Sequence, residues 1–228
     1  ERVSVSSAGQ EGNHLSGSCE ISADGRFVAF NSFAENLVIG DGNSADDIFL
    51  RDRLASQTTR VSLGPGGVEP NSSSRTPSVS ADGRYVAFES QATNLVASDL
   101  NGVQDIFVHD TATGATTRAS LGPSGAEADA ASFDAVIAAS GTVVAFTSVA
   151  TNLVSGIGNG VPDVFLRDLV ADLTSRASVS SAGIEANGGS GSAALSYDGL
   201  VVAFQSFGDN LVAGDTNNRG DVFLRDTA

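Results

Sequence analysis

The chain has 228 residues, a hydrophobic content of 41% and a formal net charge of −15. This length is sufficient for one domain with a sizeable core. The charge disfavours nucleic acids and anionic membrane surfaces as partners, because binding to either requires a basic surface. Methionine is absent, even at position 1, so we expect a processed or excised piece of a longer product.

A repeat of 58 residues organises the whole sequence. The tripeptide Val-Ala-Phe begins at Val28, Val86, Val144 and Val202, a constant spacing of 58 residues. An Asn-Leu-Val motif and an Asp-[Ile/Val]-Phe motif keep the same spacing in all four copies. A period of this length indicates a repeat architecture.

Each repeat contains four strand signals. In the second copy they are Arg75–Ser80, Arg84–Ser90, Asp105–Asp110 and Thr116–Leu121. Asp82-Gly83 and Thr113-Gly114 supply the turn residues that tight hairpins need. No window combines a helical period with caps, so no helix is predicted. The absence of a long apolar run also argues against membrane insertion.

The predicted strands are apolar on both faces, which distinguishes them from strands of a sheet that faces water on one side. Such strands suit the blades of a β-propeller, because each blade packs between two neighbours. Eight of the 12 phenylalanines recur at two repeat positions, and we expect them between blades. These positions are Phe30, Phe88, Phe146, Phe204, Phe49, Phe107, Phe165 and Phe223.

The sequence begins with a fourth-strand segment of the repeat and ends just after a third strand. Glu1–Ser4 matches the fourth strand of a blade, and Asp226–Ala228 lies just past a third strand. We therefore predict an all-β, four-bladed propeller over residues 1–228, each blade having four antiparallel strands. In this prediction Glu1–Ser7 pairs with the last blade and closes the ring, which hides both sheet edges. A monomer is expected; a fragment of a larger ring, or two chains forming eight blades, are the alternatives.

The repeat resembles a known family. The pattern S-x-D-G-R-[FY]-V-A-F…N-L-V…D-[IV]-F-[LV]-[RH]-D…T-T-R-[VA]-S is similar to the TolB-type, WD-repeat-like propeller blade of bacterial secreted and envelope proteins. The resemblance covers the whole chain, although the third repeat has Ser140-Gly141-Thr142 where the others have Asp-Gly. It implies the propeller fold and a secreted, periplasmic or cell-surface location, but fold alone implies no particular activity.

One set of candidate site residues lies between the second and third strands of each repeat, in the pattern D-x-N-x-x-x-D. Oxygen ligands at alternating positions suit Ca²⁺, and the loops are similar to, but shorter than, the calcium loops of integrin α-chain propellers. The other interpretation is an Asx-turn, in which these side chains bind local backbone N–H groups. The third repeat has Ile157 at the first position and should be the weakest site. The candidate ligands are Asp41, Asn43, Asp47, Asp99, Asn101, Asp105, Asn159, Asp163, Asp215, Asn217 and Asp221.

A second acidic loop precedes the first strand of each repeat, in the pattern G-x-E-x-[N/D]. Four glutamates near the inner strands could surround the propeller axis, and their mutual repulsion would favour a bound cation or a protein partner. Alternatively, each glutamate caps a loop of the neighbouring blade. The residues are Glu11, Asn13, Glu69, Asn71, Glu127, Asp129, Glu185 and Asn187.

Other repeated polar residues are expected to be structural. Arg2, Arg60, Arg118 and Arg176 share one repeat position and are predicted to form ion pairs, and four serines at strand ends are predicted to form hydrogen bonds (Ser32, Ser90, Ser148, Ser206). Cys19, the only cysteine, aligns with Pro77, Ala135 and Ala193 and is expected on an inner strand. One thiol cannot form an internal disulfide.

These features favour a non-enzymatic binding or scaffold module whose acidic loop face binds Ca²⁺, a protein or a polysaccharide. Two histidines, His14 and His109, and no nucleophile-elbow motif argue against a Ser-His-Asp hydrolase. The first alternative is a calcium-dependent polysaccharide hydrolase or lyase. It would use a cluster in the third repeat that departs from the consensus, at Asp129, Phe133, Asp134 and Ile157. The second is a structural repeat excised from a larger envelope protein.

Overall fold

Four antiparallel sheets form the protein in this computed structural model, which describes residues 1–156 and 158–227. We call the sheets blades 1 to 4 in chain order. The first three have four strands each, and the fourth has three among the described residues. The structure therefore confirms an all-β chain of four blades.

The strand bounds repeat from blade to blade. Blade 1 comprises β1 (Ser16–Ile21), β2 (Phe27–Ser32), β3 (Asp47–Asp52) and β4 (Gln57–Arg60). Blade 2 comprises β5 (Ser74–Val79), β6 (Tyr85–Ser90), β7 (Asp105–Asp110) and β8 (Ala115–Arg118). Blade 3 comprises β9 (Ser132–Ile137), β10 (Val143–Ser148), β11 (Asp163–Asp168) and β12 (Leu173–Arg176), and blade 4 comprises β13 (Ser190–Leu195), β14 (Val201–Ser206) and β15 (Asp221–Asp226). Two 3-10 turns that the sequence did not predict, η1 (Pro65–Gly67) and η2 (Pro123–Gly125), lie in the links to blades 2 and 3.

The Asp-Gly turn between the first two strands also controls how closely blades approach. Ser80 Oγ donates to Asp82 Oδ1 at 2.7 Å, and Gly83 follows with a φ of 73°, in the region that favours glycine. A Cβ on Gly83 would lie 2.2 Å from the ring of Phe27 in blade 1. Glycine is therefore required there both by the turn and by the contact between blades.

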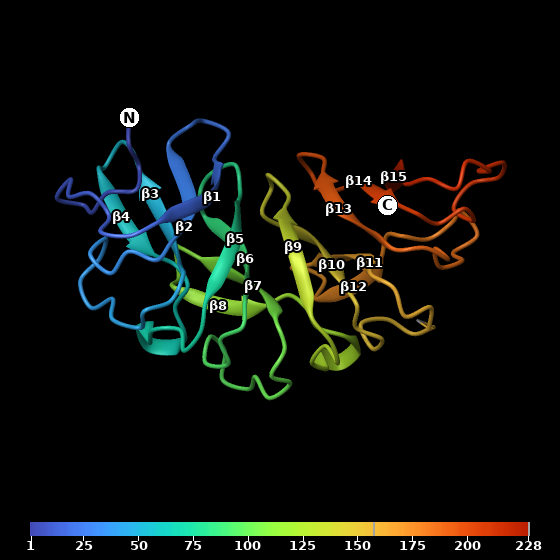
Figure 1. Cartoon of the computed structure of the whole chain (residues 1–228), viewed down its shortest axis with the longest axis horizontal. Coiled ribbons are helices and arrows are strands. Elements are labelled where there is room, and N and C mark those ends of the chain that lie inside the picture. Colours follow the sequence, from blue (N-terminus) through green and yellow to red (C-terminus); the bar gives the residue numbers. More distant parts are fainter. Residues whose placement is uncertain (157, 228) are drawn as a thin grey trace.

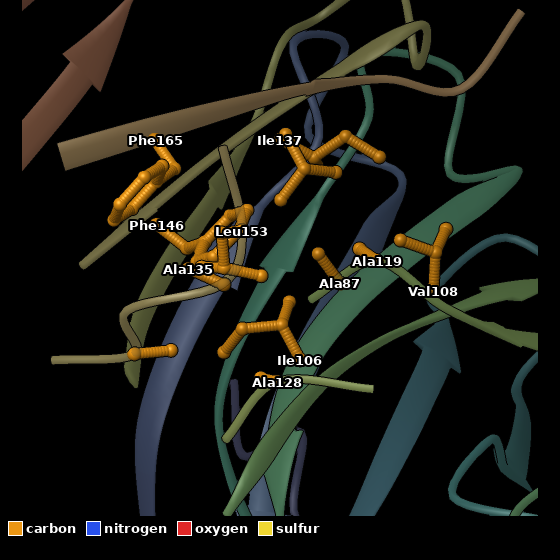
Figure 2. Close-up of a cluster of buried hydrophobic side chains, with 12 residues drawn as sticks. Ala87, Ile106, Val108, Ala119, Ala128, Ala135, Ile137, Phe146, Leu153 and Phe165 are labelled. Carbon is orange, nitrogen blue, oxygen red and sulfur yellow. The ribbon is translucent and has the colours of Figure 1, made fainter. Parts of the chain in front are cut away.

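Apolar side chains fill each boundary between blades. At the boundary of blades 2 and 3, Ile106 and Val108 pack with Ile137, Phe146 and Leu153 (Figure 2). Phe88, Phe107, Phe146 and Phe165 are fully buried and pack against residues of the preceding blade, as the sequence predicted. Phe30 and Phe49 instead cluster with residues of blade 1, and Phe223 is only partly buried. The two phenylalanines of each blade stack with centroids 5.7–6.0 Å apart. Burial of this kind is the main stabilising contribution in the fold.

The four blades follow one another along an open arc, with the N-terminus and the C-terminus near its opposite ends (Figure 1). The first strands β1, β5, β9 and β13 lie side by side. Hydrogen bonds do not close the described residues into a ring, so the predicted closure is not confirmed. Glu1–Ser7 lies against blade 1, where Thr58 Oγ1 donates to Val5 O at 2.6 Å.

Several smaller predictions can also be compared with the structure. The four strand-end serines form hydrogen bonds, for example Ser74 Oγ to Ser90 Oγ at 3.0 Å. Cys19 does lie on an inner strand, β1, but it is exposed because no blade covers that face of blade 1. Within the described ranges, the structure has no helix long and apolar enough to cross a membrane.

Candidate functional site

The D-x-N-x-x-x-D loops adopt Asx-turns at their asparagines. In blade 2, Asn101 Oδ1 accepts a hydrogen bond from Val103 N at 3.2 Å, and Asn101 Nδ2 donates to Asp105 Oδ2 at 2.9 Å. Asn43, Asn159 and Asn217 accept the equivalent backbone bond. The amide oxygen is thus used by the loop itself, as the Asx-turn interpretation predicted.

An arginine from the fourth strand lies between the carboxylates of these loops. In blade 2, Arg118 Nη1 is 3.3 Å from Asp105 Oδ2, 3.7 Å from Asp99 Oδ1 and 2.7 Å from Glu127 Oε1. We call this arrangement the arginine centre. Blade 1 repeats it, with Arg60 Nη1 lying 3.1 Å from both Asp41 Oδ1 and Asp47 Oδ2 and 2.8 Å from Glu69 Oε1. In blade 3, Arg176 Nη1 lies 3.7 Å from Asp163 Oδ2 and 2.7 Å from Glu185 Oε1.

Each arginine centre joins two successive repeats, because its glutamate comes from the link that leads into the next blade. Glu69 Oε1 also accepts a hydrogen bond from Gly42 N at 2.9 Å, and Glu127 Oε1 accepts one from Leu100 N at 2.9 Å. These glutamates therefore cap a loop of the preceding blade, the second of the two interpretations of the sequence. Each is bound to its own arginine rather than to the other glutamates.

Burial and charge oppose each other at these carboxylates. Burial raises the pKa of Asp41 to about 6, with the negative charge of Asp47 adding to the effect and Arg60 opposing it. Burial likewise raises the pKa of Asp163 to about 6. The pKa of Glu127 is lowered, because it accepts the bond from Leu100 N and lies beside Arg118. Around Arg60 and around Arg118 alike, burial raises the pKa of the two aspartates, whereas the pKa of the glutamate is lowered.

A second repeated contact, which the sequence did not reveal, holds the two long loops together. Asn94, from the Asn-Leu-Val motif, accepts a hydrogen bond from Asn71 N at 3.0 Å and donates to Glu69 O at 2.7 Å. Asn71 Oδ1 in turn accepts from Thr93 N at 2.9 Å. The same clasp occurs at Asn13 with Asn36, at Asp129 with Asn152 and at Asn187 with Asn210. Asn13, Asn71, Asp129 and Asn187 are therefore occupied in positioning the loops.

The corresponding loop of blade 4 is open. Among the described residues, Asp215 and Asp221 form no ion pair with an arginine, although Arg219 belongs to the same loop and donates its backbone N–H to Asn217 Oδ1. Asn217 Nδ2 donates to Asp221 Oδ2 at 2.9 Å. Asp47, Asp105 and Asp163 are buried, whereas Asp215 and Asp221 are half-buried. A hollow of about 550 Å³ lies beside Asp215, Asp221 and the apolar side chains of β15.

The geometry bears on the calcium prediction. In blades 1 to 3 a guanidinium already occupies the position between the carboxylates that a cation would need, so these three loops do not fit Ca²⁺. Across residues 1–156 and 158–227, no group of three or more His, Cys, Asp or Glu side chains is placed to hold a metal ion. In the part of the chain that the structure describes, the loop of Asp215, Asn217 and Asp221 is the one of the four whose carboxylates form no ion pair with an arginine. Ile157, the predicted weak position of the third loop, lies outside the described residues.

The residues considered for catalysis are held in separate contacts. His109 is buried and its Nδ1 is 3.0 Å from Thr116 Oγ1, while burial lowers its pKa. The ring of His14 lies 4.8 Å from that of Phe33. Asp129 accepts a hydrogen bond from Thr151 N, and Asp134 donates its own N–H to Glu89 Oε2 at 3.1 Å. Phe133 lies in β9, on the strand that carries Asp134.

No family model matches the sequence, and a comparison with curated proteins also finds no match. Solved structures with the same fold include a TolB-like protein from Agrobacterium tumefaciens, at 17% identity and a TM-score of 0.55 over 92% of this chain and 62% of that one. The chain has the TolB-type β-propeller fold. TolB from Acinetobacter baumannii is similar at 19% identity and a TM-score of 0.50, over 93% of this chain and 41% of that one.

A third structure is the β-propeller domain of the Trilobed protease from Pyrococcus furiosus, which has an open velcro topology. It is 12% identical, with a TM-score of 0.57 over 94% of this chain and 55% of that one. The chain thus spans less than two thirds of the length of each of these three structures. At these identities the likeness establishes the fold, which confirms the TolB-type resemblance at that level.

Proposed function

We propose that the chain is a non-enzymatic binding or scaffold module that acts in the periplasm, in the secreted fraction or at the cell surface. The observation that supports this best is how the repeated polar residues are used. The arginine centres and the asparagine clasps tie the long loops to one another and to the sheets. They build a rigid, repeated loop surface on which a protein or polysaccharide could bind.

The proposal includes completion of the last blade by an N-terminal strand, Glu1–Ser7, supplied either by this chain or by a second copy. It includes calcium only at Asp215, Asn217 and Asp221, where carboxylate and amide oxygens are the ligands that Ca²⁺ prefers. The ion would bind only while the last blade is not completed, because a completing strand would bring Arg2 beside Asp221 as Arg60 lies beside Asp47. Calorimetric titration with Ca²⁺ tests this part. We expect about one ion per chain, loss of the heat in Asp221→Asn, and unchanged heat in the matched control Asp47→Asn. No heat and no change in Tm on adding Ca²⁺ would remove calcium from the proposal.

Ligand binding is tested with an array of bacterial polysaccharides and peptidoglycan fragments, together with assays for new reducing ends on the same compounds. A binding module predicts retention of a compound that is not cleaved. Cleavage that is lost in Asp129→Asn or Asp134→Asn would instead support the hydrolase or lyase alternative. If no compound is retained and none is cleaved, the third possibility is favoured, a structural repeat of a larger envelope protein.

A further inference from the structure

Arg51, Arg167 and Arg225 share one position of the third strand, but Arg167 in blade 3 has a different partner. Arg51 and Arg225 donate hydrogen bonds to carbonyl groups of the link that leads into their own blade. Among the described residues, Arg167 pairs instead with Asp172, in the turn between β11 and β12. The side chain of Arg167 is 4% exposed, whereas that of Asp172 is 83% exposed. A buried guanidinium is thus neutralised by a carboxylate that reaches it from solvent.

Arg167 and Asp172 line two hollows. The first, of about 320 Å³, lies between blades 2 and 3 and has Val108, Leu169 and Val170 among its apolar side chains. The second, of about 330 Å³, lies between blade 3 and the η2 turn. The guanidinium therefore lies beside space that a side chain of another molecule could enter.

The turn that contains Asp172 is more apolar than its counterpart in blade 2. Val170 and Leu173 lie at the positions that Ala112 and Ala115 occupy there. Val170 is 78% exposed and Leu173 is 62% exposed. Exposed apolar side chains beside a hollow are typical of binding surfaces. Blade 3 thus combines a buried positive charge with apolar walls, which suits a ligand that carries a carboxylate and an apolar group.

We propose that Arg167 binds the C-terminal carboxylate of a peptide whose last side chain is apolar. The carboxylate takes the place of Asp172 beside the guanidinium, a group that binds carboxylates through two parallel hydrogen bonds. The apolar side chain enters the first hollow against Val108, Leu169 and Val170, where it is removed from water. A sugar acid carries the same carboxylate, but its ring hydroxyl groups suit these apolar walls less well.

The peptide gives the binding module a class of partner, and to that extent the site rests on the proposed function. The site lies at the boundary of the two middle blades, so it does not depend on what covers the ends of the arc. It also uses none of the residues proposed for calcium or for cleavage. Failure of the calcium and polysaccharide tests would therefore not affect this site, and its own failure would not affect those proposals.

Titration of the full chain with N-acetyl-leucine, followed by NMR, tests the site, and N-acetyl-leucinamide is the matched probe that lacks the carboxylate. The wild type should bind the acid and not the amide. Asp172→Gly should tighten binding of the acid about threefold or more, because it removes the competing carboxylate. The backbone tolerates this change, since Asp172 has a φ of 56° and its equivalent in blade 2 is Gly114.

Removal of the guanidinium is the opposite test. Arg167→His introduces the residue type that blade 2 has at this position, His109. It should weaken binding of N-acetyl-leucine at least about tenfold at about pH 8, where histidine is neutral. Arg51→His is the matched control in blade 1 and should leave binding unchanged. Glucuronate, a sugar acid, should bind the wild type more weakly than N-acetyl-leucine does.

Four results would overturn the proposal. They are no binding of N-acetyl-leucine by the wild type or by Asp172→Gly, equal binding of the acid and the amide, equal losses in Arg167→His and Arg51→His, and tighter binding of glucuronate. The last result would assign the carboxylate to a sugar instead of a peptide. If Arg167→His does not fold, the comparison of the wild type with Asp172→Gly decides by itself.

Discussion

Blades 2 and 4 have nearly the same motifs but different surroundings. Asp105 in blade 2 is buried between Arg118 and Ser120, and Ile106 beside it is packed against blade 3. Among the described residues, Asp221 in blade 4 has neither partner, because the described part of blade 4 has three strands, and Val222 beside it is 78% exposed. The comparison shows that a blade of this kind needs its own fourth strand to pair its aspartate and the next repeat to cover its apolar face. Such dependence on the neighbouring repeat is typical of repeat proteins.

The largest effect is expected from removing an interior arginine. Arg118→Ala leaves Asp99 and Asp105 buried without a counter-ion and should lower the free energy of unfolding by about 3–5 kcal/mol. Arg2→Ala removes the exposed ion pair with Glu11 and should change the free energy of unfolding of the monomer by less than about 1 kcal/mol. Urea unfolding measures both variants, with Arg2→Ala compared at concentrations where the wild type is also monomeric. Equal losses in the two variants would mean that the ion pairs of Arg118, inside the arc, stabilise the fold no more than the pair of Arg2 at its end.

The next effect concerns packing. Ile106→Ala opens a cavity between blades 2 and 3 and should cost about 2–4 kcal/mol in the free energy of unfolding. Val222→Ala at the equivalent position should cost less than about 0.5 kcal/mol in the monomer, because its side chain is already in water. Thermal unfolding at low protein concentration checks the pair. A large loss in the monomeric Val222→Ala variant would indicate that blade 4 is covered within one chain.

A smaller effect is expected from protons. The pKa of Asp41 is raised to about 6 in the folded chain, from about 4 when unfolded, so the folded state binds the proton more tightly. The stability that protonated Asp41 contributes to the folded state is fully present below pH 4 and is lost as the pH rises through 6. Asp41→Asn should therefore reduce the fall in unfolding free energy between pH 4 and pH 7, by up to about 2 kcal/mol.

The control for this measurement is Asp52→Asn. Hydrogen bonds from Arg26 lower the pKa of Asp52 to about 2, so its contribution is present above pH 4 and disappears as the pH falls towards 2. In this variant, the fall in unfolding free energy between pH 4 and pH 7 should therefore be the same as in the wild type. If Asp41→Asn also leaves it unchanged, burial does not raise the pKa of Asp41 in solution.

Much of the fold was predictable because its determinants are local. Asp105–Asp110 was predicted as a strand and has those bounds, and Arg84–Ser90 differs from the observed Tyr85–Ser90 by one residue. Thr116–Leu121 was predicted too far along the chain, since β8 ends at Arg118. Ring closure was harder to predict, because it depends on the angle between blades, which side-chain packing determines and the repeat length does not.

The sequence predicted both the acidic loops and the ion-pairing arginines, but it did not predict that the two meet. Arg118 is separated from Asp105 by a complete strand and a turn, and spacing along the chain does not show that the two meet. A usable signal was present: an arginine stands nine residues before the glutamate in all four repeats, at Arg2 with Glu11 and at Arg118 with Glu127. The asparagine clasp was missed because the Asn-Leu-Val motif that contains Asn94 was used only as a marker of the repeat.

The arginine centre also has a consequence for how the chain folds. Its arginine and aspartates belong to one repeat and its glutamate to the next, so a blade acquires its full electrostatic stability only after the following repeat has been synthesised and folded. Opening one interior blade would break contacts in two repeats, which couples their unfolding. Hydrogen exchange should accordingly be slow and nearly uniform through blades 2 and 3 and fastest in β15, where the N–H groups of Val222 and Leu224 would report fraying from the C-terminal end.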